Sequence, residues 1–161
     1  MERAKLWESS YTSRTIPFSI IRIGRIFSAM QQSWRNLYKV SDLFFCPLLY
    51  MAGKYEFDPF TPKEKETLKR FLTYGGFLLA EDTMGAKGFG FDRAFKTEMK
   101  QILPNHELKR LPPDHSVYRS FYLIETLGGR QRVNPYLEGI TVDQWTPVIY
   151  SQNDLSGAWA R

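Results

Sequence analysis

The sequence predicts a single α/β domain whose sheet is mainly parallel. Two apolar runs, at 43–53 and 77–80, have the composition of strands that are buried on both faces. A helical segment that begins near Pro62 lies between them, with tight connections on both sides. A strand, a helix and a strand in this order form a right-handed crossover unit with parallel strands. The carboxyl ends of the two strands therefore meet at one edge of the sheet.

The helix of this unit carries sequence signals at both ends. Thr61 and Glu64 have the spacing of a capping box, and Pro62 occupies the first helical position. Gly75 and Gly76 then end the helix, because a glycine readily adopts the left-handed conformation that closes a helix. The next strand follows at once, so the connection between the helix and the second strand is short.

A second helix and a pair of strands complete the expected fold. Asp92 is a suitable N-cap for a helix that Pro104 stops. The segment 106–125 combines a strand-like stretch, a proline turn and a helical turn at 116–121. Two strand-like runs, GITV and TPVIYS, are joined around Asp143 and Gln144, and the segment SQNDLSGAW reads as a polar turn.

Composition and charge indicate a basic segment followed by a globular body. The 161 residues are 43% hydrophobic and 16% aromatic, which is enough for one domain with a real core. Residues 1–40 hold seven basic and two acidic residues, whereas the charges of 41–161 balance. We therefore expect a basic, partly irregular N-terminal segment at 1–40 and a single α/β domain at 41–161. The basic segment is either a solvated stretch or a contact for nucleic acid, anionic lipid or an acidic partner.

Several classes of protein are disfavoured by what the sequence lacks. A single cysteine, Cys46, excludes an internal disulfide, and with two histidines it argues against a structural zinc site. No stretch approaches the ~20 uninterrupted apolar residues of a membrane helix, and no convincing signal peptide is present. The sequence identifies no cofactor and no metal site.

The stretch from Phe77 to Phe95 predicts the position of a binding site. An apolar strand leads into Glu81 and Asp82, and a glycine loop follows. Ligands of open parallel sheets bind at the carboxyl edge, and a helix N-terminus favours an anion there. The glycine spacing matches neither the dinucleotide fingerprint nor the P-loop, so the loop is either a ligand contact or a structural turn. The candidate ligand-binding residues are Gly53, Asp82, Thr83, Gly85, Gly88, Gly90, Asp92, Arg93, Arg119 and Asn153.

The candidates for catalysis are few. Asp82, His115 and Asp154 are the polar groups that could move a proton, and His115 suits proton transfer near neutral pH. No nucleophile accompanies them, since Cys46 lies in an apolar run. We expect Asp82, Asp92 and His115 to converge in one pocket at the carboxyl edge. We also expect Asp82→Ala to change ligand binding more than stability.

Residues 42–159 resemble the bacterial "domain of unknown function 4159" family. The resemblance lies in five ordered blocks: PLLYMAG, FTPKEKETLKRFLTYGGFLLAED, GFDRAFKTEMKQILP, LPPDHSVYRSFY and VIYSQNDLSGAW. It implies a three-layer sandwich, flavodoxin-like or class I glutamine amidotransferase-like. It also implies association with the bacterial cell envelope or periplasm, and it implies no established enzymatic activity.

Two departures from the family pattern bear on function. The family's usual first strand is missing here, which leaves an exposed sheet edge that could self-associate. Many relatives carry a cysteine after the acidic pair, where this chain reads Asp82-Thr83-Met84. The amidotransferase nucleophile is therefore not present at this position, which argues against glutaminase chemistry.

Three functions remain open from the sequence. The first is a non-enzymatic ligand- or protein-binding module of the cell envelope, with another protein or a second copy of the chain as partner. The second is a hydrolase or transferase that uses a polar crevice at the carboxyl edge. The third is a basic adaptor that binds nucleic acid or anionic lipid through residues 1–40, although nucleic acid is not favoured as a partner.

Overall fold

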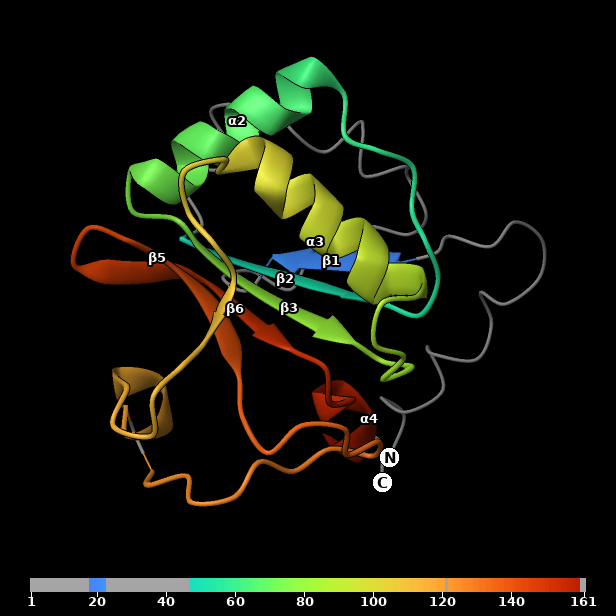
Figure 1. Ribbon diagram of the computed structural model, residues 1–161, viewed down its shortest axis with the longest axis vertical. Helices are drawn as coiled ribbons and strands as arrows, with labels where there is room; N and C mark the ends of the chain where they lie inside the picture. The colour runs from blue at the N-terminus through green and yellow to red at the C-terminus, as the bar shows by residue number, and fades with distance from the viewer. Residues whose placement is uncertain (1–17, 23–46, 121, 160–161) are drawn as a thin grey trace, which may run out of the picture.

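The computed structural model describes residues 18–22, 47–120 and 122–159, and these form an α/β domain (Figure 1). A six-stranded mixed sheet runs in the order β1-β2-β3-β6-β5-β4. The strands are β1 (Phe18–Arg22), β2 (Leu48–Gly53), β3 (Phe77–Asp82), β4 (Lys109–Arg110), β5 (Glu138–Val142) and β6 (Trp145–Ser151). The helices are α2 (Pro62–Thr73), α3 (Gly90–Ile102), the 3₁₀ helix η2 (Ser116–Tyr118) and α4 (Leu155–Trp159).

The predicted parallel arrangement holds only for the centre of the sheet. β3 pairs in parallel with β2 on one side and with β6 on the other. The pairings β1–β2, β4–β5 and β5–β6 are antiparallel, so the sheet as a whole is mixed rather than mainly parallel. Only Asp143 and Gln144 join β5 to β6. Two residues are too few for a crossover connection between parallel strands, so β5 and β6 form an antiparallel hairpin.

The crossover helix α2 forms as the sequence predicts. The hydroxyl of Thr61 accepts a hydrogen bond from the Glu64 amide at 3.4 Å, and the Glu64 carboxylate accepts one from the Thr61 amide at 2.7 Å. Gly75 follows the C-cap with a φ of 105°, which a residue with a side chain rarely adopts. The strand–helix–strand unit β2–α2–β3 is therefore confirmed.

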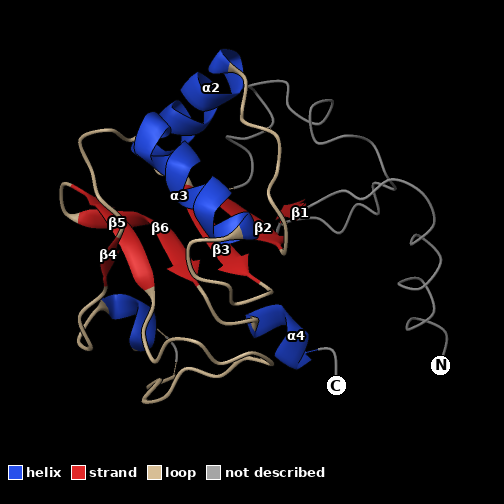
Figure 2. Ribbon diagram, turned by 45° about the vertical axis from the view of Figure 1, so that its right-hand side comes forward, coloured by secondary structure: helices blue, strands red, loops and turns tan. Residues whose placement is uncertain are grey.

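The long helices cover one face of the sheet (Figure 1). Beneath α2 and α3 lies the main core, to which β3 contributes Leu78 and Ala80 and β6 contributes Val148 and Tyr150. The rotated view shows η2 and α4 on the opposite side of the sheet (Figure 2). A smaller core there includes Ile149, with Leu79 packed against it. The side chains of each strand alternate between the two cores.

Two local predictions about helices are wrong. Phe89, not Asp92, is the N-cap of α3, and Asp92 lies inside the first helical turn. The segment that reads as a polar turn contains α4. Among the described residues no helix has the length and apolar character needed to span a membrane.

Part of the predicted N-terminal segment belongs to the sheet. Residues 18–22 form β1, which pairs with β2 from Phe18 opposite Gly53 to Arg22 opposite Leu49. The remaining residues of 1–40, and with them most of the predicted basic adaptor segment, lie outside the described residues, as does Cys46. β4 forms the opposite edge of the sheet and consists of two exposed basic residues.

Candidate functional site

The three parallel strands end together at the predicted edge. Gly53 is opposite Asp82, and Glu81 is opposite Ser151, which ends β6. Thr83 continues past β3 and donates to the Gly53 carbonyl twice, from its amide at 2.9 Å and from its hydroxyl at 3.1 Å. The loops after β2 and β3 are thereby joined directly at the carboxyl edge.

Asp82 holds the glycine loop through its backbone. One carboxylate oxygen accepts from the Met84 amide and the other from the Ala86 amide, both at 2.9 Å. The side chain is fully buried, and this burial raises the pKa of Asp82 despite the amide donors. Because both carboxylate oxygens already accept from amides of the glycine loop, Asp82 anchors the backbone of that loop.

Asp92 holds the same loop from the helix side. Its Oδ2 accepts from the Gly88 amide at 2.6 Å, and its Oδ1 accepts from the Tyr150 hydroxyl at 2.7 Å. Lys96 lies 2.9 Å from Oδ1 and also reaches Glu138 at 3.3 Å. Burial opposes ionisation of Asp92, but these donors outweigh it and lower its pKa. The pairing with Asp92 raises the pKa of Lys96 against the opposing effect of burial.

Glu81 points to the other face and holds the short helix α4. Its carboxylate accepts from the Leu155 amide at 3.0 Å and from the Ser156 amide at 3.1 Å. The hydroxyls of Tyr50 and Ser156 also donate to it. Burial and the bond to Glu81 raise the pKa of the Tyr50 hydroxyl. The two neighbouring acids of β3 therefore do separate structural jobs on opposite faces, as the strand geometry predicts.

Asn153 and Asp154 fasten the loop that precedes β5. The Asn153 side-chain oxygen accepts from the amides of Val133 and Asn134 at 2.8 and 2.9 Å. Asp154 Oδ1 caps α4 by accepting from the Gly157 amide at 2.9 Å, and its Oδ2 lies 2.6 Å from Arg130. Both residues are buried. Asp154 therefore caps the amino end of α4 and is not an exposed acid.

The glycines of the loop allow close contact between segments. Gly90 has a φ of 56°, and a Cβ on it would lie 2.5 Å from the Lys54 carbonyl oxygen. A Cβ on Gly85, whose φ is 69°, would lie 2.5 Å from a methyl carbon of Val133. Gly88 also has a positive φ, of 74°, and open space around it. The loop at 83–90 is thus pressed against the segments near Lys54 and near Val133.

Exposed apolar side chains gather where these segments meet. They are Tyr55, Met84, Phe89 and Val133, which we name the carboxyl-edge rim, and their exposed fractions are 50%, 37%, 59% and 40%. Sequence reasoning missed them, although apolar residues inside a glycine loop are a visible signal. Exposed apolar side chains that form one contiguous patch mark an interaction surface.

Basic side chains flank the carboxyl-edge rim. Lys54 precedes Tyr55, Lys87 lies within the glycine loop, and Arg132 precedes Val133; all three are exposed. They form no ion pair within the part of the chain that the structure describes. Arg93, a candidate ligand-binding residue, pairs with Glu56. The surface of this edge therefore combines apolar groups with unpaired positive charge.

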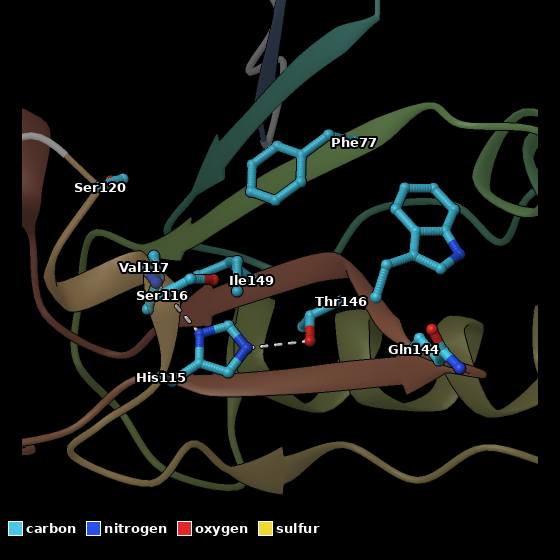
Figure 3. Close-up of a pocket in the computed structure, with 9 residues that line it drawn as sticks. Phe77, His115, Ser116, Val117, Ser120, Gln144, Thr146 and Ile149 are labelled. Atoms are coloured by element: carbon cyan, nitrogen blue, oxygen red, sulfur yellow. Dashed lines mark hydrogen bonds between the residues drawn. The ribbon is translucent and has the colours of Figure 1, made fainter.

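His115 does not belong to this edge. It lines a separate cavity together with Phe77, the first residue of β3, whereas Asp82 is the last (Figure 3). The prediction that Asp82, Asp92 and His115 share one pocket is therefore wrong for His115. Arg119 follows η2, next to His115, and is exposed. The long segment between α3 and β5 carries both residues to the opposite end of the parallel strands.

Among the described residues, neither the carboxyl edge nor the cavity at His115 offers a clear metal centre. Across the described ranges, no group of three or more His, Cys, Asp and Glu side chains is arranged to hold a metal ion. The acids at the carboxyl edge are already occupied by amides, hydroxyls and Lys96.

A comparison with models of protein families assigns the chain to a family. The model described as "Domain of unknown function (DUF4159)" matches residues 29–161. The chain belongs to the DUF4159 family. The match begins before the resembling blocks at 42–159 and includes every residue of the carboxyl-edge rim. Among curated proteins no significant match to this DUF4159 domain is found.

The contacts of Asp82 change the expected effect of removing its carboxylate. We expect Asp82→Ala to lower the free energy of unfolding by about 2 kcal/mol, because the Met84 and Ala86 amides lose their acceptors. Urea denaturation measures this change. The control Asp114→Ala alters an exposed acid and should stay within about 0.5 kcal/mol of wild type. Equal stability of the two variants would contradict the anchoring role.

Proposed function

We propose that this DUF4159 domain is a non-enzymatic protein-binding module. In this proposal the carboxyl-edge rim docks an acidic peptide segment that carries a large apolar side chain. The observation that supports it best is the exposure of Tyr55, Met84, Phe89 and Val133 on three loops that approach one another closely at Gly85 and Gly90. Large aromatic and methionine side chains are enriched where proteins bind one another.

The charge of the surface favours an acidic partner. Lys54, Lys87 and Arg132 adjoin the apolar residues, and no described acid pairs with them. An acidic segment would place carboxylates against these cations while its apolar side chain covers Phe89. Such exposed charge pairs contribute steering and specificity more than affinity, so binding should weaken as salt is raised.

The carboxylates at this edge bond groups of the protein itself, which supports a binding role rather than a catalytic one. Two of the catalytic candidates have their oxygens engaged: both oxygens of Asp82 accept from backbone amides of its own loop, and Asp154 accepts from the Gly157 amide with one oxygen and pairs with Arg130 through the other. A general base must reach the proton it removes, and these oxygens face inward. The alternative of a hydrolase or transferase in this crevice therefore has less support than a rigid docking platform.

The family resemblance adds a cellular location to the proposal. It includes association with the bacterial cell envelope, where the acidic segment would belong to another envelope protein. The parallel centre formed by β2, β3 and β6 supports the flavodoxin-like or amidotransferase-like relationship that the resemblance implies.

Peptide selection tests the proposed function. We expect a random peptide library selected on the full chain to be enriched in peptides that combine acidic residues with an aromatic residue or leucine. Phe89→Ala should weaken the binding of a selected peptide by about tenfold or more, because it removes the most exposed apolar group of the rim. Lys87→Glu should weaken it as well, by reversing one charge. Isothermal titration calorimetry measures both effects.

Tyr74→Ala is the matched control for the peptide experiment. Tyr74 is also an exposed aromatic residue, but it lies at the end of α2, next to the amino end of β3. Binding of a selected peptide should be unchanged in this variant. Enrichment without acidic residues, or equal binding to wild type and Phe89→Ala, would overturn the proposal.

A further inference from the structure

A second site lies at the amino end of the parallel strands, on the face opposite α2 and α3. A cavity of about 380 Å³ opens between β3, β6 and η2 (Figure 3). Its size falls within the range of small-molecule sites, roughly 300–1,000 Å³. Its lining residues are Phe77, His115, Ser116, Val117, Ser120, Gln144, Trp145, Thr146 and Ile149.

The cavity is formed by fixed elements. Phe77 begins β3, and Trp145, Thr146 and Ile149 lie on β6. The short helix η2 is pinned by Tyr118, which is buried and whose hydroxyl accepts from the Leu137 amide at 2.8 Å. A preformed site loses less conformational entropy when a ligand binds.

His115 sets the direction of the hydrogen bonds in the cavity. Its Nδ1 accepts from the Val117 amide at 3.2 Å, which assigns the ring proton to Nε2. Nε2 then donates to the Thr146 hydroxyl at 3.0 Å (Figure 3). The Thr146 hydroxyl keeps its own hydrogen, which it donates either to Thr141 at 3.1 Å or to a ligand.

The described lining residues offer no full charge to a ligand. Among the described residues that line it there is no carboxylate, ammonium or guanidinium group, and both ring nitrogens of His115 are already bonded. A charged group of a ligand that entered the cavity would lose water without gaining a charged partner, which is costly. The polar groups that remain are the hydroxyls of Ser116, Ser120 and Thr146 and the amide of Gln144. Each of these groups both donates and accepts.

The apolar part of the lining contains two aromatic residues, Phe77 and Trp145, beside the aliphatic Val117 and Ile149. Phe77 and Trp145 are half-buried, so part of each ring stays accessible at the cavity. A ring face accepts the flat C–H face of a ligand, while hydroxyl and amide groups bond its edge. Ser116, Ser120 and Gln144 are exposed, so a bound ligand would remain partly in contact with water.

We infer that this cavity binds a neutral saccharide unit. A sugar ring combines an apolar C–H face, for Phe77 or Trp145, with hydroxyls that donate and accept, for the serines, Thr146 and Gln144. A neutral sugar also matches a lining without full charges. The site is separate from the carboxyl-edge rim and does not depend on peptide docking there.

Titration of the full chain with sugars tests this inference. Methyl glucoside and N-acetylglucosamine are the neutral probes, glucosamine and glucuronate are the charged ones, and adenosine is a neutral aromatic one. Nuclear magnetic resonance follows the Trp145 indole and the amides of 116–120 and 144–146. A neutral sugar should shift these signals with a Kd of about 1 mM, and the charged sugars and adenosine should bind at least about tenfold more weakly.

Variants locate the binding in the cavity. Ser120→Trp places a large ring at the exposed mouth and should weaken binding of the neutral sugar about tenfold. Thr73→Trp makes the same change at an exposed position of α2 and should leave binding unaltered. Thr146→Val removes one hydrogen-bonding group at nearly constant shape and should weaken binding about threefold.

Three results would overturn the inference. The first is the absence of shifts with either neutral sugar. The second is tighter binding of a charged sugar or of adenosine. The third is binding of a neutral sugar that Ser120→Trp leaves unchanged.

Discussion

Glu81→Ala should cause the largest loss of stability among the changes considered, about 4 kcal/mol. Glu81 is fully buried and accepts hydrogen bonds from the Leu155 and Ser156 amides and from two hydroxyls. Alanine would leave these donors unpaired, and each unsatisfied buried donor costs about 1–3 kcal/mol. If α4 detached from the domain, water would bond to these donors, and the loss in the free energy of unfolding would be smaller. Guanidinium denaturation measures the change in the free energy of unfolding.

Hydrogen exchange separates this effect from general destabilisation. The amides of Leu155 and Ser156 should lose protection in Glu81→Ala more than the amides of α2 do. Glu107→Ala is the control, because Glu107 is exposed and pairs only with Lys109 among described residues; its stability should change by less than about 0.5 kcal/mol. Retained protection of Leu155 and Ser156 in Glu81→Ala would contradict the role of Glu81 in holding α4.

Asp92→Ala should lower the free energy of unfolding by about 3 kcal/mol. The change would leave the buried Tyr150 hydroxyl without its acceptor and would remove one of two carboxylates around Lys96. It would also free the Gly88 amide, so the glycine loop should become less ordered. Thermal and urea denaturation measure the stability. A change below about 1 kcal/mol would show that the loop and helix α3 do not depend on Asp92.

The pH dependence of this effect has a definite sign. The folded-state pKa of Asp92 is lowered from an unfolded value of about 3.9, so its stabilising contribution is present above that pH and is lost as the pH falls further. The stability gap between wild type and Asp92→Asn should therefore narrow below about pH 4. Asp82 has a raised pKa and works in the opposite direction, since its folded form binds a proton more tightly. A gap that widens on acidification would contradict the assignment for Asp92.

Local signals in the sequence predict the first half of the domain well. The capping box at Thr61 and Glu64, the glycines after α2 and the two apolar runs each depend on neighbouring residues only. For this reason the β2–α2–β3 unit and the carboxyl edge could be found without a structure. The two runs that form β5 and β6 could be found in the same way, but their antiparallel pairing was not predicted.

Other features depend on contacts between distant segments. The helix α4 has five residues and contains Gly157, so its own propensity is weak. It exists because Glu81, more than seventy residues away in the chain, accepts from its first amides. His115 was misplaced because no local pattern tells which end of the sheet the segment after α3 reaches. The rim was missed because exposure depends on how the three loops pack.

Hydrogen exchange of the full chain with and without a selected acidic peptide tests the central claim most directly. The claim is that the carboxyl edge recognises a protein segment on a platform fixed by buried acids. It predicts that the peptide protects amides at 54–55, 84–89 and 131–133 and leaves 116–120 unchanged. Protection confined to 116–120 and 144–146, with none at 84–89, would contradict it.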